Sequence, residues 1–111
     1  MDVKHAFEVP AEPIEGLQGV TIRWLWAEKD GVPNFALRLF EVQPGASTFY
    51  HTHPYEHELY VLSGQAVLRS KDAERSLAAN DTAFVPENEE HQIVNTGQSM
   101  LRFLCAIPLQ P

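Results

Sequence analysis

The residues best suited to chemistry are histidines, and three of the five in the chain fall within fourteen residues. The stretch HTHPYEHELYVLSG carries His51, His53 and His57, and a later run, HQIVN, begins at His91. Neutral imidazole is a common ligand for divalent transition metals. An H-x-H pair alone more often consists of solvent-exposed histidines or of core histidines with hydrogen-bond partners. Three histidines that bracket a proline-containing turn favour a metal site instead.

Extended strands would bring these imidazoles together. Side chains two residues apart in a strand point to the same side, so a strand through residues 51–53 directs His51 and His53 to one side. Pro54 then turns the chain, and His57 opens the next run across from that pair. We therefore expect neighbouring strands and the turn between them to assemble the ligands.

Short apolar runs separated by turn residues make up the rest of the chain. The run VTIRWLWAE alternates between two faces, with Trp24 and Trp26 on the same face. No segment has a sustained period of 3.6 with helix caps. Eight or nine short strands with regularly spaced turns predict an all-β protein, a sandwich or a small barrel. The other runs with strand character are residues 35–42, 57–62, 65–70, 82–85, 91–95 and 100–107.

Length and charge restrict the organisation and the partners. A chain of 111 residues can form one hydrophobic core. We expect residues 1–19 to be an extended arm and residues 20–111 a single domain. A net charge of −7 predicts repulsion from nucleic acid and from anionic membranes. The N-terminus lacks a signal-peptide pattern, no apolar run is long enough to span a membrane, and the chain has one cysteine, so we expect a cytoplasmic protein.

Two segments resemble the conserved motifs of the cupin superfamily. The first runs from Gly45 to Gly64 and includes both histidines of the H-x-H pair. The second includes Pro86, His91 and Asn95 at the family's spacing. The resemblance covers about residues 20–108. It implies a jelly-roll β-barrel, the cupin double-stranded β-helix, with a metal held inside.

The chain departs from these motifs at three positions. Asn80 and Asn88 stand where the second motif has glycine, and asparagine tolerates positive φ better than most residues. The glutamate ligand of the first motif is replaced by His57, although Glu58 is an alternative because some members place the glutamate one residue later. Counting back from Gly64 favours His57, and so does strand alternation.

With His57 as a ligand, the chain resembles the small single-domain cupins that bind manganese through four histidines. The implied ligands are His51, His53, His57 and His91. The resemblance implies manganese, one ion per chain. The ligand chemistry alone does not select it, because imidazole suits iron, copper, nickel or zinc at least as well.

Such a site implies a metal-dependent oxidoreductase that acts on a small organic substrate. Four neutral imidazoles leave the charge of the metal uncompensated, and an octahedral ion would keep two positions open. We expect a dioxygenase or oxidase type of enzyme that uses oxygen or peroxide. The alternatives are a non-redox isomerase or lyase and a non-catalytic module that binds a small molecule.

Strand alternation nominates further residues for the interior. Arg38, Ile93, Phe103 and Cys105 are candidates for the pocket. Arg38 would orient an anionic substrate, or it is a solvated edge arginine. Cys105 would lie near the metal, or it is a small buried apolar residue. Because small cupins commonly pair through sheet edges, we also expect a homodimer.

Overall fold

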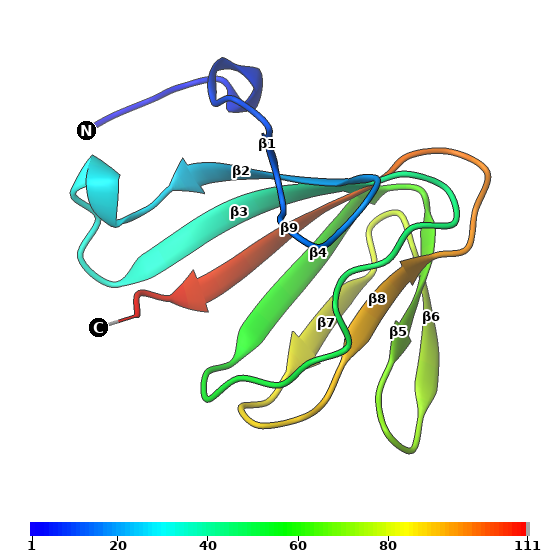
Figure 1. Ribbon diagram of the computed structural model, residues 1–111. Coiled ribbons are helices and arrows are strands. Elements are labelled where there is room, and N and C mark those ends of the chain that lie inside the picture. Colours follow the sequence, from blue (N-terminus) through cyan, green and yellow to red (C-terminus); the bar gives the residue numbers. More distant parts are fainter. Residues whose placement is uncertain (111) are drawn as a thin grey trace.

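The chain folds into two antiparallel sheets (Figure 1). The main apolar core is built from buried residues of both sheets. The computed structural model describes residues 1–110. The larger sheet has the strand order β1-β2-β3-β9-β4-β7, and the smaller has the order β6-β5-β8. Along the chain the elements are η1 (Ala6–Glu8), β1 (Glu12–Pro13), β2 (Val20–Trp26), η2 (Glu28–Asp30), β3 (Phe35–Val42), β4 (His57–Ser63), β5 (Gln65–Arg69), β6 (Glu74–Ala78), β7 (Thr82–Val85), β8 (Gln92–Asn95) and β9 (Leu101–Pro108).

Alternating side chains explain why these segments are strands with one buried face. In β9 every second residue from Leu101 to Ile107 is buried, and β4 alternates in the same way from His57 to Val61. Burial of one face of each sheet against the other supplies the main stabilisation. The predicted all-β jelly-roll class is confirmed. No helix among the described residues is long and apolar enough to cross a membrane.

Two strands were not anticipated, and an expected one is absent from residues 51–53. In β6 only Leu77 is buried, so this polar strand has no alternation to reveal it. β1 lies in the segment expected to be an arm and pairs with β2. The expected strand through His51 and His53 reduces to one bridge between His51 and His91. The two histidines therefore converge through a loop that the bridge fastens.

A bulge in β2 interrupts the alternation expected for the two tryptophans. The pairing with β3 shifts register between Trp24 and Trp26. Leu25 is buried in a second small cluster with Val9 and Leu39, and Trp26 packs against that cluster. Trp24 instead packs against the main core. The bulge thus separates the environments of the two indole rings.

Asparagines hold three turns of the chain. Asn80 and Asn88 adopt positive φ values of 73° and 65°, as expected for asparagine in place of glycine. Asn95 is buried, and its Nδ2 donates hydrogen bonds to the carbonyl oxygens of Val42 (2.8 Å) and Ser99 (2.9 Å). These bonds fasten the turn after β8 to the end of β3.

The segment expected to be an arm contributes to the interior. Ile14 and Leu17 pack against the main core and line the cavity described below. Pro111, the last residue of the expected domain, lies outside the described residues.

Candidate metal centre

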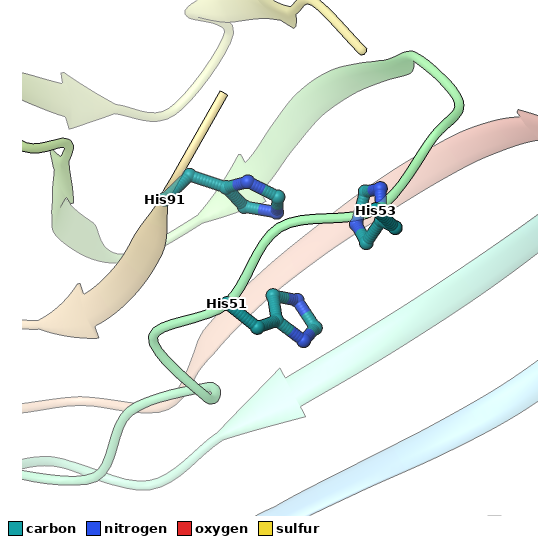
Figure 2. Close-up of side chains that lie close together, drawn as sticks. All are labelled: His51, His53 and His91. Atoms are coloured by element: carbon teal, nitrogen blue, oxygen red, sulfur yellow. The ribbon is translucent and has the colours of Figure 1, made fainter. Parts of the chain in front are cut away.

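Four imidazole rings gather at one end of the space between the sheets. The ring centres of His51, His53 and His91 lie 4.9–5.0 Å from one another. His57 adds a fourth ring, 4.0 Å from His53 and 5.1 Å from His91. Figure 2 shows three of these side chains reaching into one region from adjacent segments of chain. Residues separated by up to forty positions in sequence therefore share one small volume.

Three of the four rings are held through Nδ1 by a second partner. His53 Nδ1 lies 3.1 Å from the carbonyl oxygen of Tyr55, and His91 Nδ1 lies 2.9 Å from that of Glu89. His57 Nδ1 lies 3.1 Å from Cys105 Sγ. A carbonyl oxygen can only accept, so His53 and His91 carry the proton on Nδ1 and keep the electron pair of Nε2 free, which is the usual arrangement for metal-binding histidines. The Cys105 thiol orients the ring of His57.

The spacing of the nitrogen atoms fits one metal ion. The ligand nitrogens of His51, His53 and His91 all lie within 4.8 Å of one another. Nitrogens about 2.1 Å from one ion can be no more than about 4 Å apart, so small side-chain rotations would complete the site. His57 Nε2 is directed at the ring nitrogens of His53, so it can serve as a fourth ligand to the same ion. The donor set is therefore suited to a divalent transition metal.

The side chain of Glu58 lies on the other side of β4. Residues along β4 alternate between buried and exposed, and His57 is buried whereas Glu58 is exposed. Glu56 is also exposed, and hydrogen bonding between the two carboxyl groups raises the pKa of Glu58. The geometry therefore makes His57 the fourth candidate ligand and leaves Glu58 outside the cluster.

Burial keeps the imidazoles uncharged. Desolvation, with repulsion from His53 and Arg38, lowers the pKa of His57 from 6.5 to about 3. Desolvation likewise lowers the pKa values of His51 and His53. Because only neutral imidazole can bind a metal, the folded protein presents these ligands in the form that binds.

The cluster opens into a cavity of about 370 Å³ with mostly apolar walls. This volume lies within the range of about 300–1,000 Å³ that is typical of small-molecule sites. Arg38, Ile93, Phe103 and Cys105, the four residues nominated for the pocket, all line it. Glu12, which is exposed, is the only carboxylate among the described lining residues. Burial raises the pKa of the Cys105 thiol, so it remains protonated at neutral pH.

Several aromatic residues of the wall were not nominated from the sequence. Tyr55 stacks on His53 with ring centres 4.2 Å apart, and Phe40 stacks on Phe103 at 5.0 Å. Trp24 and Phe49 also line the cavity. The position of Tyr55 between two candidate ligands was a sequence signal for this role. Strand alternation was a second signal, because it places Trp24 on the face of Ile22 and Phe40 on the face of Arg38. Only Phe49 depends on the conformation of a loop.

The metal-free protein should lose stability as the pH falls below about 6.5. The pKa of His57 is about 3 in the folded state and 6.5 in the unfolded state. Between these values the unfolded chain binds a proton that the folded chain does not, so the free energy of unfolding decreases with falling pH. We expect the Tm of the metal-free protein to fall progressively between pH 6.5 and about 3.

Two variants separate His57 from other titrating groups. His57→Gln should show a smaller decrease in Tm over this pH range. His5→Gln changes an exposed histidine and should follow the parent curve. Equal slopes for the parent and His57→Gln would contradict the prediction.

Comparisons with known proteins agree with the fold. The Cupin_2 family, described as Cupin domain, matches residues 38–107. The oxalate-binding protein of Thermotoga maritima is 36% identical over 115 residues, which cover 96% of this chain and 93% of that protein. The tetracenomycin polyketide synthase protein TcmJ of Streptomyces glaucescens is 32% identical over 95 residues, or 84% of this chain and 64% of TcmJ.

Two solved structures have the same fold as this chain. The polyketide cyclase RemF from Streptomyces resistomycificus superposes with a TM-score of 0.92 at 34% identity, over 99% of this chain and 80% of RemF. A predicted oxalate decarboxylase from Thermotoga maritima superposes with a TM-score of 0.86 at 28% identity, over 98% of this chain and all of that one. The family match covers more than half of the chain, including His51, His53, His57 and His91. The chain belongs to the cupin domain family.

Proposed function

We propose that this protein is a metal-dependent oxidoreductase that acts on a small, flat organic substrate. The observation that carries the proposal is the opening of the four-histidine cluster into an apolar cavity of ligand size. A purely structural metal site is closed by its four protein ligands and has no such cavity. We propose manganese as the native metal, with iron, copper, nickel and zinc as alternatives.

Different side chains would bind the metal and the organic part of the substrate. His51, His53, His57 and His91 would hold the metal through imidazole nitrogens. A metal with open positions supplies a binding point for oxygen, for peroxide or for an oxygen atom of the substrate. Trp24 and the stacked Phe40–Phe103 pair provide a flat wall for an unsaturated ring. The apolar walls exclude water from the reacting atoms.

Redox chemistry is favoured because the described cavity wall offers no buried carboxylate that could act as a general base away from solvent. Its only carboxylate, Glu12, is exposed. Arg38 is permanently charged, and burial raises the pKa of the Cys105 thiol. The histidines would be occupied as ligands. A reaction that needs a strong base beside the substrate would therefore lack one here.

A second candidate is a non-redox ring closure with the metal as a Lewis acid. The likeness to the polyketide cyclase RemF over 99% of this chain favours it, as does the similarity to TcmJ. Ring closure of a substrate that already carries acidic C–H bonds requires little help from a protein base. The same cavity would serve both reactions, and only the metal requirement would differ.

An oxygen electrode and mass spectrometry can separate the two candidates. Metal-free protein is reconstituted with Mn²⁺, Fe²⁺ or Zn²⁺ and mixed with one of two probes. 1-Hydroxy-2-naphthoate tests oxygenation, and an aromatic 1,3-diketone that carries a third ketone further along its chain tests ring closure, because the carbon between the first two carbonyls can attack the third and close a six-membered ring. Oxygen uptake with an oxygenated product, in the manganese or iron form alone, is the expected result. Equal conversion by the zinc form without oxygen uptake would support ring closure. Stoichiometric binding of these probes without product would leave a binding module and contradict both candidates.

A further inference from the structure

Arg38 is a buried cation that no acidic group of the described residues neutralises. Its exposed fraction is 8%, and it lines the cavity. Its Nη2 donates a 2.9 Å hydrogen bond to Cys105 Sγ, whereas its Nε is buried without a partner among residues 1–110. Burying a charge without a counter-charge is strongly unfavourable. A ligand that supplies a negative charge would explain why a charged guanidinium is buried at this position.

Strand register fixes Arg38 on the inner face of the larger sheet. β3 lies between β2 and β9, and Arg38 pairs with Trp24 on one side and Cys105 on the other. The guanidinium carbon lies 5.5 Å from the ring centre of Trp24 and 5.0 Å from that of Phe40. These rings and the sulfur hold the guanidinium in place but do not neutralise it, because cation–π attraction is modest and sulfur is a weak acceptor.

The same sulfur atom connects Arg38 with the histidine cluster. Cys105 Sγ lies 2.9 Å from Arg38 Nη2 and 3.1 Å from His57 Nδ1. The guanidinium and the imidazole therefore lie against one atom, at the same end of the cavity. A metal held by His57 and its partners would be a second positive centre beside Arg38. Two cations that face one apolar space attract an anion into it.

We propose that Arg38 is the specificity-determining residue of this cavity and that the substrate is a flat aromatic carboxylate. The carboxylate accepts hydrogen bonds from Arg38, whose planar fork matches its geometry. The ring lies against the aromatic wall formed by Trp24 and Phe40. This inference deepens the function proposed above and depends on it for the catalytic role of the site, but binding of the anion at Arg38 can be tested without turnover.

A pair of probes of the same shape isolates the charge. 2-Naphthoate and 2-naphthamide differ in charge but hardly in size, and their binding can be followed by quenching of tryptophan fluorescence, because Trp24 lines the cavity. The measurement uses the full chain in metal-free and Zn²⁺-loaded forms. We compare the parent with Arg38→Met, Arg38→Lys and Arg69→Met. Arg69 is an exposed arginine that pairs with Glu74 on the smaller sheet, and it serves as the matched control.

The parent should bind 2-naphthoate at least about tenfold more tightly than 2-naphthamide in both forms, as expected for hydrogen bonds to a charged group. Arg38→Met should abolish this preference and leave the affinity for 2-naphthamide unchanged within about threefold. Arg38→Lys should keep part of the preference, because it retains the charge without the fork. Arg69→Met should behave as the parent.

Two results would overturn the role of Arg38. One is a parent protein that binds the acid and the amide equally well. The other is a preference for the acid that persists in Arg38→Met, which in the zinc form would assign the anion to the metal. If Arg38→Met fails to fold, the parent and Arg38→Lys decide the question.

The outcomes also separate this inference from the proposed function. A parent that binds no metal but prefers the acid supports Arg38 and refutes the metalloenzyme. A parent that binds zinc at one ion per chain without preferring the acid refutes Arg38 and leaves the metal site standing.

Discussion

Replacing His57 with alanine is expected to weaken metal binding by more than about 100-fold. Loss of a group that is hydrogen-bonded to a metal ligand typically lowers the affinity for the metal by about 10–100-fold, and loss of the ligand itself should lower it further. His57 is buried beside His53 and His91, and its Nδ1 is held by Cys105, so its Nε2 is directed into the cluster. Elemental analysis and competition with a chromophoric chelator would measure the change.

Glu58→Ala is the matched control for this prediction. Glu58 follows His57 directly in sequence, but its side chain is on the exposed face of β4. Metal content and affinity should therefore equal those of the parent. Retention of full affinity in His57→Ala together with its loss in Glu58→Ala would assign the fourth ligand to the carboxylate. The four-histidine site would then be wrong.

Replacing Gly64 with alanine is expected to destabilise the protein by about 3 kcal/mol and to lower Tm by more than about 10 °C. Gly64 joins β4 to β5 at a φ of +94°, which side chains rarely adopt. A Cβ there would lie 2.9 Å from Leu101 Cα and from the carbonyl oxygen of Met100. Both contacts are with backbone atoms, so neither can be relieved by a side-chain rotation. Thermal and urea unfolding of the metal-free protein would measure the loss.

Gly31→Ala is the control that separates the cost of the close contact at residue 64 from the cost of a positive φ. Gly31 has a similar φ of +83°, but nothing lies within 4 Å of the position that a Cβ would take. We expect a loss of about 1 kcal/mol for this variant, from the backbone conformation alone. Equal losses in the two variants would show that the close approach of β9 to Gly64 has no energetic consequence.

Local pattern was sufficient to predict most strands and the candidate ligands. Alternation marks β4 and β9 clearly because each buries one face only, and that alternation also separates His57 from Glu58. It fails for β6, in which only Leu77 is buried, and at the bulge between Trp24 and Trp26. In both places the pairing partner, rather than the strand's own side chains, determines the structure.

The sequence by itself determined most of the strands, the histidine spacing and the positive-φ asparagines, because each depends on neighbouring residues. Only the tertiary structure decided the role of Arg38, for which the sequence allowed either the interior or a solvated edge. Arg38 is placed between Trp24 and Cys105 by the order β2-β3-β9, which joins residues 67 positions apart. No local rule encodes that register, because it depends on how distant strands align when both sheets bury their apolar faces together.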